Sequence, residues 1–181
     1  MSINWVLSPY YELSFVKFND FNNVLCFTDF IKKLETLKYG IKLSENSIIG
    51  KIENYINKMN TKIEFNIWIN IYGTKHSKII FEYLSDEIIQ ICFCFFEEDI
   101  NKKGMTKLKE LLNDLMLEFN GIVGMVGYET VCNMIFFKTK KDYPNKEYTV
   151  KKLEYYTNED IYKNNEKWLS GVELIIWGNK N

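Results

Sequence analysis

The spacing of apolar residues predicts that strands and helices alternate along the chain. Alternating apolar and polar residues predict a strand over 11–18, and three closely spaced runs predict an antiparallel meander over 62–72, 78–84 and 87–96. In the third run both sets of alternate residues are apolar, so we expect a central strand that is buried on both faces. Further strands are predicted over 3–7, 122–128, 131–138 and 172–177.

Four segments carry apolar residues at helical spacing. The first is predicted to begin at the N-cap Thr28 and to stop at Gly40, and the second to begin at the N-cap Ser47. The clearest helix is predicted over 105–119, and a short one over 158–169. The predicted inward-facing residues are Phe30, Ile31, Leu34 and Leu37 in the first helix, and Ile48, Ile49, Ile52, Ile56 and Met59 in the second.

The order of these elements predicts an α+β fold. From residue 87 onward the order is strand, helix, strand, strand, helix, strand, which is the split βαβ order of ferredoxin-like domains. We expect the N-terminal strands to extend that mixed or antiparallel sheet, with the helices packed on it. No linker or low-complexity tract divides the chain. The sequence therefore predicts one domain over 1–181, with two fused subunits of one sheet, 1–84 and 85–181, as the alternative.

Composition limits the chemistry that the chain can perform. Its 181 residues are 46% apolar with a formal net charge of -1, which allows a core but gives no overall field toward nucleic acid or an anionic membrane. Arginine is absent, as alanine is, in a composition typical of an AT-rich genome, so no guanidinium fork can bind phosphate. No apolar stretch approaches the roughly 20 residues that span a bilayer. Without a signal-peptide pattern at the start, we expect a cytoplasmic protein with reduced cysteines.

Two features could bind a metal or move a proton, and for both we favour a structural interpretation. Cys92 and Cys94 lie two apart on a predicted strand, but zinc sites usually need four nitrogen or sulfur ligands and no second pair is nearby. Buried packing is therefore the predicted role of both thiols. His76 lies in a turn, with no carboxylate or nucleophile that the sequence pairs with it. We predict no metal, no cofactor and no catalytic residue.

The glycine-rich run over 121–127 is a third candidate, because such loops can hold phosphate. A phosphate loop leads from a strand into a helix N-terminus, whereas this run follows a helix and enters a strand. We therefore expect Gly121 to cap the helix, and Gly124 or Gly127 to lie at a bulge or a close packing contact.

Charge is unevenly distributed along the chain. Residues 82–129 contain ten acids and four lysines, net -6, whereas 130–152 contain six lysines and two acids, net +4. Three of these acids recur every four residues on the predicted helix, where like charges cost about 0.2–0.5 kcal/mol per adjacent pair. A basic partner would relieve that repulsion, and a merely hydrated helix face, softened by Lys107, is the alternative. The predicted partner-binding residues are Glu97, Glu98, Asp99, Glu110, Asp114, Glu118 and Glu129.

Three blocks of the sequence resemble the small cytoplasmic immunity proteins of bacterial polymorphic toxin systems. This resemblance implies a non-enzymatic, acidic-faced α+β domain that binds one toxin domain and blocks its active site. The blocks are Leu13-Ser-Phe-Val-Lys-Phe18 followed by Phe27-Thr-Asp-Phe-Ile-Lys-Lys-Leu34, then Phe119-Asn-Gly-Ile-Val-Gly-Met-Val-Gly-Tyr-Glu129, and the closing Trp168-Leu-Ser-Gly-Val-Glu-Leu-Ile-Ile176.

We therefore expect an immunity protein that neutralises a cognate toxin, such as a basic nuclease, and that touches neither nucleic acid nor membrane itself. The acids would steer the partner, and nearby aromatic residues would anchor it. Two alternatives stay open. One is an enzyme or small-ligand-binding protein with a pocket in the sheet lined by Trp68, Tyr72 and Tyr128. The other is a structural module that self-associates through a sheet edge.

Overall fold

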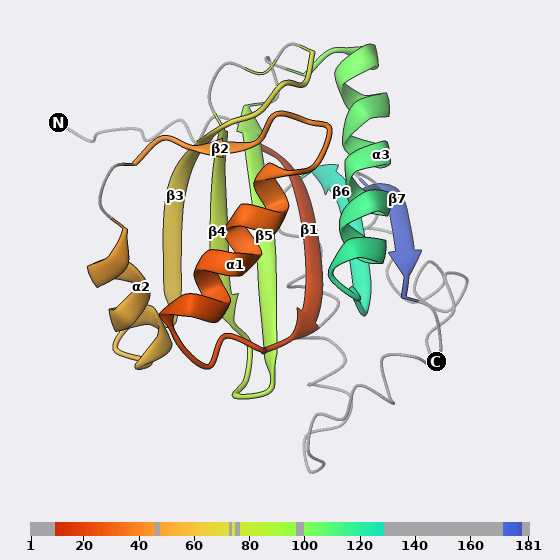
Figure 1. Cartoon of the computed structure of the whole chain (residues 1–181). Helices are drawn as coiled ribbons and strands as arrows, with labels where there is room; N and C mark the ends of the chain where they lie inside the picture. The colour runs from red at the N-terminus through yellow and green to blue at the C-terminus, as the bar shows by residue number, and fades with distance from the viewer. Residues whose placement is uncertain are drawn as a thin grey trace, which may run out of the picture.

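One antiparallel sheet organises the part of the chain that the structure describes. The computed structural model describes residues 10–45, 48–72, 74, 77–96, 100–128 and 172–178. Over these residues the chain forms three helices and seven strands, and every pair of neighbouring strands is antiparallel. All three helices lie on the same face of the sheet (Figure 1). The α+β class is thus confirmed.

The elements are β1 (Tyr10–Phe18), α1 (Val24–Glu35), β2 (Lys42–Leu43), α2 (Ile49–Ile56), β3 (Lys62–Trp68), β4 (Ser77–Tyr83), β5 (Ile88–Phe96), α3 (Lys102–Glu118), β6 (Val123–Tyr128) and β7 (Val172–Trp177). The order of the strands in the sheet is β2-β3-β4-β5-β1-β6-β7. None of the helices in the described ranges has both the length and the apolar character that crossing a membrane requires.

The predicted meander is present as β3, β4 and β5, and β5 is the central strand of the seven. The position of β1 differs from the expectation that the N-terminal strands extend the sheet, because β1 is inserted between β5 and β6. Since β1 is antiparallel to both, β5 and β6 are parallel to each other, and α3 connects them. The complete ferredoxin-like arrangement stays a prediction, because its elements over 131–138 and 158–169 lie outside the described residues, as does the predicted strand over 3–7.

Both faces of β5 are buried, as the sequence predicted. Alternate residues of a strand point to opposite faces. One set lies under the helices, and the other lies on the opposite face, which we call the second face. Burial on the second face includes a polar residue and two thiols as well as an aliphatic side chain. The helix-facing set is Ile89, Ile91, Phe93 and Phe95, and the second-face set is Ile88, Gln90, Cys92 and Cys94.

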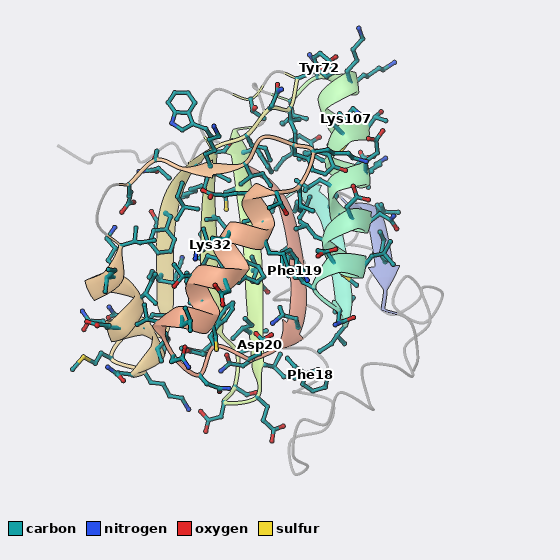
Figure 2. All side chains as sticks on the ribbon, viewed as in Figure 1. Phe18, Asp20, Lys32, Tyr72, Lys107 and Phe119 are labelled. Atoms are coloured by element: carbon teal, nitrogen blue, oxygen red, sulfur yellow. The ribbon has the colours of Figure 1, made fainter. Side chains whose placement is uncertain are left out.

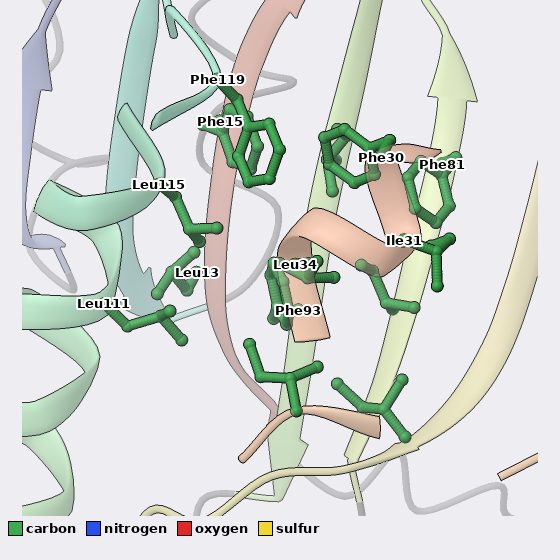
Figure 3. Packing of buried hydrophobic residues seen from close by; sticks show 14 of the residues in the cluster. Leu13, Phe15, Phe30, Ile31, Leu34, Phe81, Phe93, Leu111, Leu115 and Phe119 are labelled. Carbon is green, nitrogen blue, oxygen red and sulfur yellow. The ribbon is translucent and has the colours of Figure 1, made fainter. Parts of the chain in front are cut away.

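Aromatic side chains join α1 to the sheet and to the end of α3. Phe30 of α1 lies between Phe81 of β4 and Phe119, which follows α3 (Figure 3). The ring centroids of Phe30 and Phe119 are 4.2 Å apart, and those of Phe27 and Phe81 are 4.7 Å apart. Aromatic pairs at such distances contribute about 0.5–1.5 kcal/mol beyond the burial of their area. These contacts therefore hold α1 and α3 in a defined relation on one face of the sheet.

The predicted start of the first helix is wrong by about one turn. Asn23, not Thr28, is the N-cap, and its side-chain oxygen accepts a hydrogen bond from the Cys26 N–H at 2.9 Å. Thr28 lies inside α1, where its hydroxyl donates to the Val24 carbonyl. The earlier start makes Phe27 a helical residue of the buried face. The helix ends at Glu35, so Gly40, although its φ is +62°, lies in the following loop and does not end the helix.

The second helix is confirmed, with a different inward face. Ser47 lies outside the described residues, and α2 begins at Ile49 with no side-chain cap bond. Ile52 is buried as predicted, but Ile49 and Met59 are 60% and 74% exposed. The reason is Tyr55, whose ring stacks on the Tyr83 ring of β4 at 4.3 Å and turns the buried stripe away from Ile49. Met59 lies beyond the end of the helix.

The third helix is confirmed, and the glycine run matches its prediction in part. Leu108, Leu111, Leu112 and Leu115 form the buried face of α3. The residue in the left-handed conformation after this helix is Asn120, with φ 51°, so Gly121 is not the cap. Gly124 is a close packing contact, because a Cβ there would lie 2.7 Å from Leu112 Cδ1. Gly127 lies at the register shift between β6 and β7, where a bulge was expected.

Candidate functional site

Helix α3 carries the predicted acidic row on the edge that faces α1. Glu110, Asp114 and Glu118 are spaced by four residues, which places them on one side of a helix. The neighbouring Leu111 and Leu115 are fully buried against the core, and they fix the rotation of α3 on the sheet. The carboxylates therefore occupy defined positions at the border between core and solvent.

Each of these three carboxylates is paired with a lysine. Two of the lysines come from α1 and the loop after it, and the third lies one turn earlier on α3. The row is therefore close to electrically neutral, which corrects the expectation of an uncompensated acidic face. We call these six residues the acid–lysine row. The pairs are Lys107 Nζ to Glu110 Oε2 at 2.6 Å, Lys38 Nζ to Asp114 Oδ2 at 3.1 Å, and Lys33 Nζ to Glu118 Oε1 at 2.8 Å.

The centre of the row is the most strongly held. The Tyr39 hydroxyl donates a hydrogen bond of 2.6 Å to Asp114 Oδ2, beside the ion pair from Lys38. Burial raises the pKa of the Asp114 carboxyl, but the bonds from Tyr39 and Lys38 outweigh it and the pKa lies below its usual 3.8. Burial, and then the same bond to Asp114, raise the pKa of the Tyr39 hydroxyl. Asp114 is therefore an ionised acceptor at neutral pH.

The two ends of the row differ in their surroundings. At the C-terminal end, Lys33 Nζ lies 5.6 Å from the Phe119 ring centroid as well as on Glu118, so this lysine joins α1 to α3. At the N-terminal end, the Glu110 carboxylate raises the pKa of the Lys107 amine through a hydrogen bond. Figure 2 shows Tyr72 close to Lys107 at this end of the helix.

Two exposed side chains, one aromatic and one aliphatic, lie near the two ends of α3. Tyr72 is 58% exposed, and Lys103 Nζ lies 5.8 Å from its ring centroid. Leu117 is 62% exposed and precedes Glu118 on α3. Ion pairs flanked by an aromatic and an aliphatic side chain are a composition found at protein–protein contacts, where a few residues, mainly Trp, Tyr and Arg, carry most of the binding energy.

Other predicted site residues lie elsewhere. Trp68 and Tyr72 are largely exposed, so they do not enclose a pocket as the small-ligand alternative requires. Tyr128 is the last residue of β6. The predicted partner-binding residues Glu97, Glu98, Asp99 and Glu129, and the turn residue His76, lie outside the described residues.

The sequence missed one group of possible metal ligands. Glu12 of β1 lies beside Cys92 and Cys94 of β5 on the second face, and the three ligand atoms are within 4.8 Å of one another. No local signal could have joined Glu12 to the two cysteines, because the pairing of β1 with β5 brings together residues about 80 positions apart.

None of the protein-family models, curated proteins or solved structures compared with the chain matches it.

Proposed function

We propose that the chain is an immunity protein that binds and neutralises a cognate bacterial toxin and catalyses no reaction. The observation that carries this proposal is the acid–lysine row, with three partly exposed carboxylates spaced by four residues on a helix that is fixed to the sheet. The three sequence blocks that resemble immunity proteins support it independently.

In this proposal a basic side chain of the toxin replaces a lysine of the row. Lys33 and Lys38 are more than half exposed, and an exposed ion pair contributes only about 0–1 kcal/mol, so the exchange costs little. The toxin's arginines would gain most, because they can bind a carboxylate through two parallel hydrogen bonds. Tyr72 and Leu117 would then supply the desolvated anchors.

This form of recognition differs from steering by an acidic field. The row contains three acids and three lysines, so it exerts little long-range attraction on a basic partner. Each carboxylate pairs with one positive group in both states, a lysine of the row before binding and a basic side chain of the toxin after it. We therefore expect the association to depend only weakly on salt, with specificity set by the fixed spacing of the carboxylates.

Co-expression with the product of the gene immediately upstream tests the proposal. The first variant combines Glu110→Gln, Asp114→Asn and Glu118→Gln, which removes the three negative charges and leaves side chains of similar shape. The matched control combines Lys33→Gln, Lys38→Gln and Lys107→Gln, which breaks the same ion pairs and leaves the carboxylates in place. Cell viability, co-purification and the thermal unfolding of each variant are measured.

We expect the carboxylate variant to lose protection and to bind at least about tenfold more weakly, whereas the lysine variant keeps or improves both. Unchanged protection in the carboxylate variant would show that the acid–lysine row is not part of the surface that binds the toxin. Equal losses in the two variants, accompanied by equal losses of stability, would give the row a structural role only. An upstream product that is not toxic on its own would end the immunity proposal.

A further inference from the structure

Two neighbouring strands bring one carboxylate and two thiols together on the second face of the sheet. Glu12 of β1 is the direct partner of Cys94 on β5, and Cys92 lies two residues away on the same face of that strand. The two sulfur atoms are 3.7 Å apart. Cys94 Sγ lies 4.0 Å from Glu12 Oε1. This cluster lies on the opposite face of the sheet from α3 and the acid–lysine row.

These separations are those of ligands around one tetrahedral cation. With zinc–sulfur bonds of about 2.3 Å, two thiolates in a tetrahedral site are about 3.8 Å apart. With a zinc–oxygen bond of about 2.0 Å, a sulfur and a carboxylate oxygen are about 3.5 Å apart. The observed sulfur–sulfur distance agrees with this geometry, and the distance from Cys94 Sγ to Glu12 Oε1 is about 0.5 Å longer than it requires, so the Glu12 oxygen must move toward the sulfurs on binding.

The surroundings of the cluster also favour a cation. Cys92 and Cys94 are each only 5% exposed, so their thiolates would be shielded from bulk water. Gln90 lies two residues before Cys92 on the same face and is 3% exposed, and among the described residues its Oε1 has no hydrogen-bond partner. An unsatisfied buried acceptor costs about 1–3 kcal/mol, which a cation or a cation-bound water next to it would offset.

The charges in and around the cluster also suit a bound divalent cation. Two thiolates and one carboxylate around a divalent cation leave one excess negative charge. Lys78 of β4 is the direct partner of Cys94 on the other side and lies on the same face. Its Nζ is 3.6 Å from Glu64 Oε2, and its ammonium group adds positive charge on this face of the sheet. Binding would release the two thiol protons to the solvent, since thiolates are the ligands.

We propose that Glu12, Cys92 and Cys94 bind a thiophilic divalent cation of the zinc class, with the fourth position taken by water or by the Gln90 amide oxygen. This replaces the simple packing role predicted for the two cysteines. The site is independent of the proposed immunity function, because it shares no residue with the acid–lysine row.

Titration of the chelator-treated full chain with Co²⁺ tests this site, because thiolate ligation gives charge-transfer absorption in the near ultraviolet and tetrahedral geometry gives intense bands in the red. We expect both signals to saturate at one Co²⁺ per chain and to disappear when Zn²⁺ is added. Cys92→Ser and Cys94→Ser should abolish the charge-transfer bands, and Glu12→Gln should weaken binding about 10–100-fold. Cys26→Ser on α1 is the matched control and should bind like the wild type.

Thermal unfolding gives a second readout that does not depend on colour. Zn²⁺ should raise the melting temperature of the wild type and of Cys26→Ser, and should leave that of Cys92→Ser unchanged, because a ligand stabilises only the state that binds it. A wild-type Co²⁺ spectrum without thiolate charge transfer would overturn the proposal, whether or not the cysteine variants fold. Equal Co²⁺ affinity in the wild type and in a folded Cys92→Ser, Cys94→Ser double variant would overturn it as well.

Discussion

Replacing Gly104 with alanine should destabilise the protein, although alanine is the better helix former. Gly104 lies in the first turn of α3, and its N–H donates to the side chain of the N-cap Asn101 at 2.9 Å. A Cβ at this position would lie 2.3 Å from the carbonyl oxygen of Tyr72. Carbon and carbonyl oxygen normally approach no closer than about 3.3 Å, so the backbone at one of the two residues must move by about 1 Å.

Two opposing effects decide the sign. Helix propensity favours alanine over glycine by at most about 1 kcal/mol. Overpacking against a rigid neighbour costs about 1–3 kcal/mol, and a displaced first turn also loses part of the N-cap bond, which contributes about 1 kcal/mol. The balance is a net loss of about 1–3 kcal/mol. For a chain of this length, that corresponds to a melting temperature lower by roughly 2–12 °C.

Thermal and urea unfolding followed by circular dichroism measure this difference. The matched control is Gly50→Ala in α2, where an added Cβ meets nothing within 4 Å. At this position only the higher helix propensity of alanine should act. We expect it to raise the free energy of unfolding by about 0.5 kcal/mol near a helix end, and the melting temperature by about 1–2 °C. If Gly104→Ala is as stable as the wild type while Gly50→Ala is more stable as expected, the proposed clash with the Tyr72 carbonyl does not occur.

Two further substitutions test the interactions around the core and the row. The lowered pKa of Asp114 means that its bonds stabilise the fold fully above about pH 5 and are lost as the pH falls through that pKa. Asp114→Asn should therefore flatten the decline of urea stability between about pH 5 and pH 2, and a decline as steep as that of the wild type would contradict this. Tyr55→Phe removes a buried hydroxyl for which the described part of the chain offers no hydrogen-bond partner, while the ring can still stack on Tyr83. It should raise the free energy of unfolding by about 1 kcal/mol in urea titrations, and a loss of stability would show that the hydroxyl is satisfied.

The elements that depend on local pattern could be predicted from the sequence. The doubly apolar alternation of β5 indicated a central strand, and the short turns on either side of β4 indicated the meander. The start of α1 was not predictable in the same way, because Asn23 and Thr28 are both good N-cap residues. The burial of Phe27 against Phe81 decides between them, and that contact joins distant segments.

The missed features of both candidate sites have the same physical origin. The spacing of the acids placed them on one side of α3, but Lys33 and Lys38, which neutralise two of them, precede them by about 80 residues. Likewise, Cys92 and Cys94 were visible as a pair, whereas Glu12 joins them only through the β1–β5 register. Local periodicity assigns a residue to a face of its own element and does not say which distant element covers that face.

The interior position of β1 bears on how the chain is made. This strand is synthesised before both of its neighbours, and one of them, β6, follows it by about 100 residues. At translation rates of about 5–20 residues per second, the nascent strand waits roughly 5–20 s before both of its edges can be paired. Pairing of both edges of β1 therefore waits until β6 has been synthesised, and this long-range pairing gives the fold a high contact order and the slow folding rate that accompanies it.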